Sequence, residues 1–256
     1  SYFGYITQAI VNNFAPLLFV TFQRSFGISL EKIAGLVTVN FFMQLVVDLA
    51  CAKFIDRIGY RVSIVAAHLF AGAGLIMLGT LPFALPDPYI GLLISIGFYA
   101  VGGGLIEVLI SPIVEACPTD KKSAAMSLLH SFYCWGHVAV ILLTTLFFVT
   151  AGIKNWHFLA YLWAIIPFAN AVYFCLVPIN SLAAEGGAAP MKELFKSKLF
   201  WILAVLMVCS GASEQAMSQW SSAFAEAGLK VSKTVGDLLG PVSYTHLRAH
   251  ETCADL

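Results

Sequence analysis

The sequence contains few charged residues. Asp, Glu, Lys and Arg make up only 11% of its 256 residues, against about 25% in an ordinary soluble domain. The 14 basic and 14 acidic residues cancel to a formal net charge of zero, so no charge excess points to nucleic acid as a partner. Hydrophobic residues make up 59% of the chain, which predicts that most of its surface faces a lipid bilayer.

Sequence motifs of enzymes and of ATP-driven pumps are missing as well. No HExxH, GxSxG or P-loop pattern occurs, so the sequence predicts neither an intramembrane protease nor an ATP-driven pump. The six cysteines have no CxxC or other regular spacing, which is typical of apolar packing residues rather than of disulfides or zinc ligands. His130 and His137 share a helix face and His68 stands alone, but a metal needs further ligands nearby, so we expect no metal site.

Apolar runs of about 20 residues, the length that crosses a bilayer, occur seven times. They cover residues 3–23, 32–53, 62–83, 89–116, 124–151, 156–179 and 199–225. Pro, Gly and charged residues separate the runs, as they do between consecutive transmembrane helices. The predicted fold class is therefore an all-α polytopic membrane protein.

Lys and Arg are distributed unevenly between alternate loops. One set comprises Lys53, Arg57, Arg61, Lys121, Lys122, Lys192, Lys196 and Lys198. The other set comprises Arg24, Lys32, Lys154, Lys230 and Lys233. Because basic loops stay in the cytoplasm, the larger set is predicted to be cytoplasmic in a multi-pass protein of the plasma membrane.

A short internal repeat predicts how the helices are grouped. Placing Gly27 on Gly228 superposes the first span on the seventh and aligns two further identical residue pairs. Six helices and a linker separate the copies, as in transporters built from two parallel halves. The predicted domains are a six-helix N-terminal bundle at 1–179, a cytoplasmic linker at 180–198 and the start of a C-terminal bundle at 199–241.

The chain changes character at about Pro241. The repeat predicts that residues 237–252 match the apolar second span, but this segment carries His246, Arg248 and other polar residues that hydrocarbon cannot solvate. Residues 242–256 resemble a translated sequencing-library adapter, so we expect a non-native tail and a truncated second bundle. The alternative is a genuine polar C-terminal tail after a short eighth helix. The chain also opens on Ser1 without a signal peptide, and we expect its natural start to lie upstream.

The segment that follows the second span carries a recognisable motif. It reads AKFIDRIGYR from Ala52 to Arg61 and resembles the loop motif of the major facilitator superfamily. Asp56, Arg57, Gly59 and Arg61 match that motif, and Ala52 stands where Gly is usual. The resemblance implies a loop that helps hold the outward-facing state, in which the charges pair with charges and helix ends of the opposite half. The alternative is an ordinary basic loop with a tight turn at Gly59.

The fourth span places ionisable and polar residues on one helix face. Glu107, Ser111 and Glu115 are spaced four residues apart. An ionised group at mid-membrane costs about 2.5–3.5 kcal/mol on insertion scales, so such residues usually face a cavity and mark an ion or proton pathway. Glu115 lies nearer the cytoplasmic end, where we expect a structural or loop-facing role.

Together with the His130-Ser131 segment of the fifth span, this helix resembles the fucose-permease branch of the superfamily. The Gly-rich run and the Glu are present, and Ser111-Pro112 stands where the branch has Asn-Pro. The resemblance implies that Glu107 is the proton-coupling residue and that the solute is a sugar. His130 is the second proton-coupling candidate, as part of a relay or as a solute contact. The alternative is a structural Glu107 satisfied by a neighbouring helix.

Polar residues at helical spacing are predicted to line a central solute cavity. The candidates are Tyr5, Gln8, Asn12, Asn40, Gln44, Ser131, Glu214, Gln215, Gln219 and Trp220. Amides, hydroxyls and aromatic faces suit a sugar or a similar polyol, whereas the alternative for each stripe is hydrogen bonding between helices. Asp48 shares a face with Gln44 but lies near the cytoplasmic loop, so we expect it to form a structural ion pair.

These features together predict a secondary active transporter that moves a small solute by alternating access. The predicted form is a monomeric, proton-coupled symporter of a sugar or a similar polar metabolite, whose partners are the solute and the lipid bilayer. No cofactor is expected, because the proton gradient supplies the energy. The alternatives are a drug or metabolite efflux antiporter of the same superfamily and a seven-helix receptor or sensor.

Overall fold

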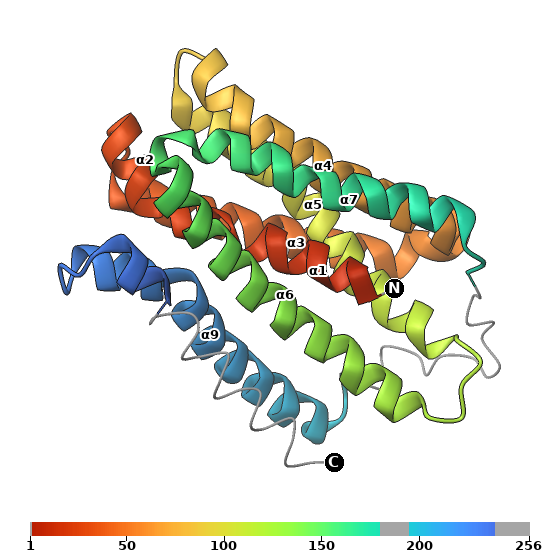
Figure 1. Ribbon diagram of the computed structural model, residues 1–256. Helices are drawn as coiled ribbons and strands as arrows, with labels where there is room; N and C mark the ends of the chain where they lie inside the picture. Colours follow the sequence, from red (N-terminus) through yellow and green to blue (C-terminus); the bar gives the residue numbers. More distant parts are fainter. Residues whose placement is uncertain (1, 180–194, 239–256) are drawn as a thin grey trace.

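The computed structural model describes residues 2–179 and 195–238 (Figure 1). Most of the predicted linker, residues 180–194, and the adapter-like tail both lie outside the described residues, so those two assignments stay predictions. The side chains of Ala52, Lys53 and Asp56 also lie outside the described part of the chain.

The described residues are helical and contain no strand. The first span is interrupted: α1 (Tyr2–Asn13) leads into the 3₁₀ helix η1 (Ala15–Leu18) and then α2 (Phe19–Phe26). The other elements are α3 (Leu30–Ile58), α4 (Tyr60–Ala84), α5 (Pro88–Glu115), α6 (Lys122–Ala151), η2 (Ile153–Asn155), α7 (Trp156–Leu176) and α9 (Lys198–Ala227). Within the described residues, seven helical segments are long and apolar enough to cross a membrane, which confirms the all-α polytopic fold.

Local sequence explains where several of the helices begin. Ser29, Asp87 and Ser197 precede α3, α5 and α9, and each side-chain oxygen accepts a hydrogen bond from a backbone N–H in the first turn. Such caps satisfy donors that have no partner inside the helix. Gly59 joins α3 to α4 with a φ of 90°, a conformation that is accessible to glycine and strained for other residues.

The first span occupies the centre of the six-helix group, and 89% of its most apolar window is buried. Asn170 of α7 anchors it by donating to Thr7 Oγ1 at 3.0 Å and to the Phe3 carbonyl oxygen at 2.9 Å. Lipid hydrocarbon offers no hydrogen-bond partners, so hydrogen bonds from a side-chain amide to a neighbouring helix hold helices together inside a membrane.

Small residues let α4 and α5 approach each other closely. A Cβ atom on Gly102 of α5 would lie 2.5 Å from the backbone nitrogen of Ala71 and 2.6 Å from the carbonyl oxygen of Ala67, both on α4. The two backbones are therefore in direct contact, which is the way that helices gain packing energy when the hydrophobic effect no longer drives their association.

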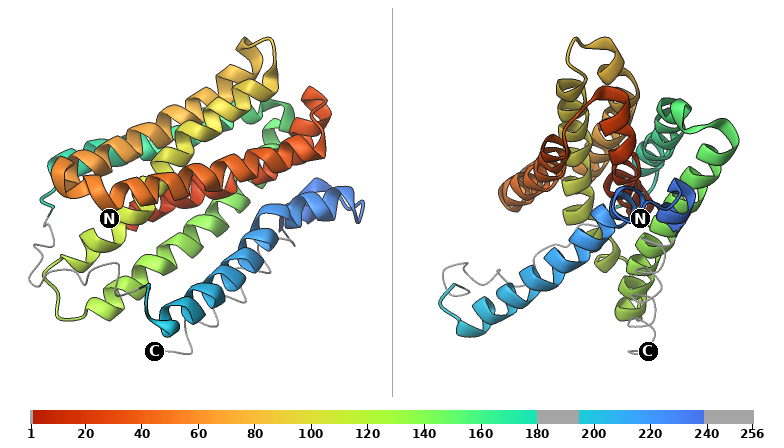
Figure 2. Two further views of the ribbon diagram at one scale, coloured as in Figure 1. Left: turned by 180° about the vertical axis from the view of Figure 1, so that it is seen from behind. Right: turned by 90° about the vertical axis from the view of Figure 1, so that its left-hand side faces the viewer.

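The bundle has two opposite ends. At the Gly27 end α2 meets α3, and at the Gly59 end α3 meets α4. Helix α9 starts at the Gly59 end, splayed away from the other helices, and reaches them only at the Gly27 end (Figure 2). Its residues from Leu199 to Cys209 are exposed or half-buried, whereas Gln219, Ser222 and Glu226 are buried.

The close α4–α5 contact predicts that added side-chain volume at Gly102 destabilises the protein. Gly102→Ala places a methyl group against backbone that cannot rotate away, so we expect the free energy of unfolding to fall by about 1–3 kcal/mol. Gly97→Ala on the same helix is the control, because a Cβ atom there meets nothing within 4 Å, and alanine favours the helix by about 1 kcal/mol over glycine. SDS titrations of detergent-solubilised protein measure the free energy of unfolding of both variants. Equal stability of the two variants would refute the packing argument.

Candidate functional site

A cavity of about 360 Å³ lies among α1, α3, α5, α6 and α9. Its wall is formed by Tyr5, Gln8, Asn12, Phe41, Gln44, Leu45, Asp48, Glu107, His130, Tyr133, Glu214 and Gln215. Most of these side chains end in an amide, a carboxyl, a hydroxyl or an imidazole group, which is unusual for residues of membrane-spanning helices. The lining of the cavity therefore offers hydrogen-bonding groups of the kind that a polar solute requires.

Gln8 and Glu107 form the central contact of the cavity wall. Gln8 Nε2 donates to Glu107 Oε2 at 3.3 Å, and Gln8 is only 3% exposed. Its Oε1 atom has no hydrogen-bond partner among the described residues. One turn further along α5, the hydroxyl groups of Tyr5 and Ser111 lie 2.9 Å apart. Helix α1 thus presents an amide and a phenol to the acidic face of α5.

A second amide network crosses from α3 to α1. Gln44 Nε2 donates to Asn12 Oδ1 at 3.0 Å and to Asn40 Oδ1 at 3.3 Å. All three side chains are buried. Asn12 and Gln44 line the cavity, while Asn40 lines a smaller hollow beside it. The network therefore both joins two helices and forms part of the polar wall.

Aromatic rings and His130 border the cavity on the α6 side. The ring of Tyr5 lies 5.7 Å from that of His130 and 6.2 Å, edge to face, from that of Tyr133. Tyr133 was not among the predicted site residues. Its position three residues after His130, on the same helix face, is the signal that would have identified it.

The structure brings eight of the predicted residues together and leaves four outside the cavity. Tyr5, Gln8, Asn12, Gln44, Glu107, His130, Glu214 and Gln215 line it. Asn40 and Gln219 line the smaller hollow. Ser131 donates its hydroxyl to the Ser127 carbonyl oxygen at 3.0 Å, and the Trp220 ring packs on Phe19 at 5.3 Å.

Asp48 differs from the expectation of a structural ion pair. The described residues form two ion pairs, Arg24–Glu226 and Lys233–Asp237, and Asp48 belongs to neither. Asp48 instead lines the cavity, and its buried Oδ1 atom has no hydrogen-bond partner among the described residues. In the same part of the chain, no group of three His, Cys, Asp or Glu side chains is arranged to hold a metal ion.

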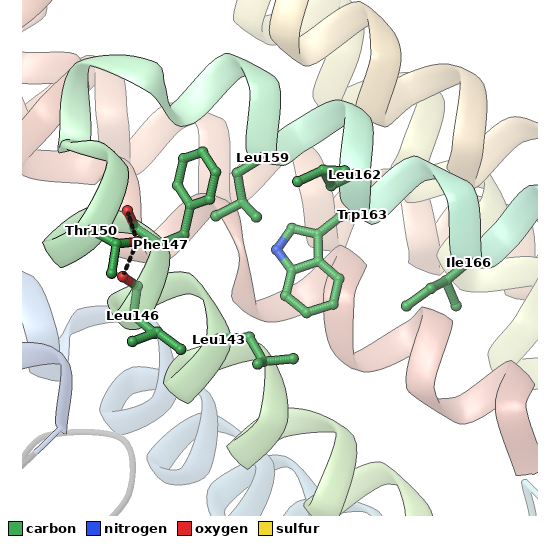
Figure 3. Close-up of a pocket in the computed structure, with 8 residues that line it drawn as sticks. All are labelled: Leu143, Leu146, Phe147, Thr150, Leu159, Leu162, Trp163 and Ile166. Carbon is green, nitrogen blue, oxygen red and sulfur yellow. Dashed lines mark hydrogen bonds between the residues drawn. The ribbon is translucent and has the colours of Figure 1, made fainter.

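A second hollow of similar volume lies between α6 and α7 but has a different chemistry (Figure 3). Its wall is apolar apart from the Trp163 indole N–H and the Thr150 hydroxyl, which donates to the Leu146 carbonyl oxygen at 2.9 Å. Leu143 and Leu162 are more than half exposed along its rim. It is a groove on the apolar outer face of the bundle rather than a site for a polar solute.

Pro16 explains how α9 contacts α1. In an α-helix the carbonyl of residue 12 accepts from the N–H of residue 16, and proline has no N–H. The freed carbonyl oxygen of Asn12 accepts instead from Gln219 Nε2 of α9 at 2.9 Å. Ser218 donates to Asn13 Oδ1 at 3.1 Å beside it. The break in the first span thus forms a docking point for the seventh span.

Charged residues extend this contact toward the Gly27 end. Arg24 Nη1 lies 2.8 Å from Glu226 Oε1. Lys233 donates to the Leu17 carbonyl oxygen and pairs with Asp237, which also accepts from Ser222. Because these contacts lie on one side of the cavity and α9 splays away on the other, the described helices are closed at the Gly27 end and apart at the Gly59 end.

The loop motif serves a contact inside the six-helix group. Arg61 donates from Nη1 to the Cys175 carbonyl oxygen at 2.7 Å and from Nη2 to the Val177 carbonyl oxygen at 2.9 Å. These carbonyls belong to the C-terminal end of α7, where backbone acceptors lack helical partners and the helix dipole is negative. The expected pairing with a helix end is present, but that helix is α7 and not one of the opposite half.

Within the described residues, seven apolar helical segments, with a polar cavity among α1, α3, α5, α6 and α9, define a multi-pass membrane protein. The family model of the Major Facilitator Superfamily matches residues 2–245, and the chain therefore belongs to the major facilitator superfamily, a family of membrane transporters rather than enzymes. A search of curated proteins found no match.

The Arg61 contacts predict a difference between the two arginines of the motif. Arg61→Gln removes a charged donor from two carbonyl oxygens, so we expect the free energy of unfolding to fall by about 1–2 kcal/mol. Arg57→Gln is the control, because Arg57 is exposed and makes no hydrogen bond or ion pair to the described residues. Thermal melts followed by circular dichroism compare the variants, and an equal loss in both would contradict the capping role.

The Pro16 docking point predicts that two substitutions are coupled. Gln219→Ala leaves the buried Asn12 carbonyl unpaired and is expected to weaken the closed contact by roughly 1–3 kcal/mol. Pro16→Ala restores the helical N–H, so the same change in the Pro16→Ala background should cost much less.

Hydrogen exchange of the α9 amides around Gln219 measures the free energy of this contact. Gln215→Ala serves as the control, since Gln215 lies one turn earlier on α9 and faces the cavity. Additive effects of Pro16→Ala and Gln219→Ala would show that the freed carbonyl is not what Gln219 binds.

Proposed function

We propose that the protein is a proton-coupled symporter of a sugar or a similar polar metabolite, and that it works by alternating access. The observation that carries this proposal is the contact between Gln8 and Glu107 in the wall of a polar cavity inside the membrane-spanning helices. In this proposal Glu107 accepts the proton and the Gln8 amide binds the solute. Because one hydrogen bond joins these two side chains, binding of the proton affects binding of the solute.

The chemistry of this contact supports a proton-linked cycle. An ionised carboxylate accepts strongly from an amide N–H, and protonation turns one carboxyl oxygen into a donor. A proton on Glu107 therefore changes what Gln8 binds, and a solute that competes for Gln8 changes the affinity of Glu107 for the proton. His130, which lines the same cavity beside Tyr5, is suited to pass the proton to or from the cavity.

The composition of the cavity wall supports a hydroxylated solute. Asn12, Gln44 and Gln215 offer amide donors and acceptors, while Tyr5 and Tyr133 offer hydroxyls and ring faces. Sugar hydroxyl groups need several such partners at once. A volume of about 360 Å³ lies within the range of small-molecule sites, and the resemblance of the fourth span to the fucose-permease branch favours the same solute class.

The arrangement of α9 supports alternating access. Contacts through Gln219, Arg24 and Lys233 close the Gly27 end, while the start of α9 stands apart at the Gly59 end (Figure 2). If the basic loops at the Gly59 end are cytoplasmic in a plasma-membrane protein, as proposed from their charge, this arrangement is inward-open. Rocking of the two halves would break the Gly27-end contacts and form others at the Gly59 end.

A proton gradient is the proposed source of energy, and no cofactor is required. Moving one charge is worth about 2.3 kcal/mol per 100 mV of membrane potential, which exceeds the roughly 1 kcal/mol of a typical hydrogen bond in the closed contact. The proposed working unit is a monomer in the bilayer with the small solute as its partner.

Glu107→Gln tests the coupling directly. We expect this substitution, made in a full-length relative and assayed in proteoliposomes, to reduce gradient-driven uptake of the solute at least tenfold, because a neutral amide cannot carry the proton, while exchange of solute across the membrane continues. Glu115→Gln is the matched control on the same helix, since Glu115 is exposed at the Gly59 end and lies outside the cavity wall.

The direction of the response separates symport from the efflux antiporter. A symporter accumulates solute on the side toward which protons flow, and an antiporter accumulates it on the opposite side. Undiminished gradient-driven uptake in Glu107→Gln would remove Glu107 from the mechanism.

A further inference from the structure

Among the described residues, the cavity wall holds three carboxyl groups, and its one ionisable basic group is the imidazole of His130. Asp48, Glu107 and Glu214 contribute carboxyl groups, and no Lys or Arg is among the described residues that line the cavity. The two ion pairs within the described part of the chain are Arg24–Glu226 and Lys233–Asp237, so neither Asp48 nor Glu107 is neutralised by a basic side chain there. The site therefore repels anions and attracts cations.

Asp48 and Glu107 act on each other across the cavity. Both side chains line the same cavity, although they lie on different helices, α3 and α5. Two carboxylates that share a site cannot both remain ionised cheaply unless a positive charge comes between them. A cationic group bound at this point would offset that repulsion.

Two acceptor atoms of the wall have no donor. Asp48 Oδ1 and Gln8 Oε1 make no hydrogen bond within the described residues, and Gln8 is only 3% exposed. Gln8 also donates from its Nε2 atom to Glu107, so its side chain adjoins the acidic wall. Buried acceptors without donors are costly. Both atoms are enclosed by protein in this arrangement, and because both side chains line the cavity, rotation of either one brings its oxygen to an N–H group of a ligand.

A primary ammonium group fits this set of acceptors. It carries a positive charge and three N–H donors, which match the carboxylates of Asp48 and Glu107 and the free oxygen of Gln8. A bound metal ion is a poorer fit, because the described residues hold no cluster of three metal-ligating side chains. The neighbouring amides of Asn12 and Gln44 remain available for hydroxyl groups on the same solute.

We propose that the solute is an amino sugar or a comparable amino polyol, whose protonated amine binds between Asp48 and Glu107 with Gln8 as the third acceptor. This inference rests on the proposed function and narrows its solute class. It assigns Asp48 a role in specificity.

Calorimetric titration of the purified chain in detergent tests the inference with matched probes. Glucosamine carries the amine, N-acetylglucosamine has the same scaffold without the charge, glucose lacks the nitrogen, and glucuronate is an anion. We expect glucosamine to bind at least tenfold more tightly than N-acetylglucosamine or glucose, and glucuronate to give no heat of binding.

Variants identify the groups responsible. Asp48→Asn should reduce the ratio of the glucosamine affinity to the glucose affinity at least tenfold, and Glu107→Gln should reduce the same ratio at least tenfold. Glu115→Gln, outside the cavity, should leave both unchanged. Thermal melts without solute establish that each variant is folded, and if Asp48→Asn does not fold, Asp48→Glu keeps the charge and is expected to retain the preference for glucosamine.

The outcomes separate this inference from the proposed function. Equal binding of glucosamine, N-acetylglucosamine and glucose overturns the amine site and leaves the sugar proposal standing. Undiminished glucosamine binding in both Asp48→Asn and Glu107→Gln also overturns it. Absence of binding by every probe overturns the amine site and the sugar proposal together.

Discussion

A single missing N–H group organises the contact between the first and the seventh spans. Pro16 cannot donate to the Asn12 carbonyl, so α1 ends at Asn13 and a 3₁₀ turn follows. Gln219 of α9 satisfies the freed oxygen. The same break follows directly after the polar face formed by Tyr5, Gln8 and Asn12. It therefore separates α1, which lines the cavity, from α2, which lies at the closed Gly27 end. In transporters, interrupted helices commonly occur where solutes bind.

The buried side-chain amides differ in how completely they are hydrogen-bonded. Asn170, Gln44 and Gln219 use their amides to join helices, which is a structural role. Gln8 differs because only its Nε2 atom is bonded, to a carboxylate, while its oxygen has no donor. Hydrocarbon offers no hydrogen bonds, so an unpaired buried acceptor of this kind is energetically costly.

Basic side chains make different contacts at the two ends of the bundle. At the Gly27 end, Arg24 and Lys233 bridge the first span and the region of α9. At the Gly59 end, Arg61 of the loop motif holds the end of α7 within the six-helix group. Separation of the halves at the Gly59 end therefore leaves the Arg61 contact intact, since both of its partners move together.

Hydropathy and periodicity by themselves determined the seven spans and the helical class, and they grouped polar residues on single helix faces, because these properties are local to each helix. The tertiary structure decided which polar face meets which neighbour. It placed Asp48 and Tyr133 in the cavity, left Ser131 and Trp220 outside it, and turned Gln219 toward the carbonyl freed by Pro16. A helical repeat specifies that residues share a face. The rotation of that face depends on packing contacts such as Gly102 against α4, which join residues distant in sequence.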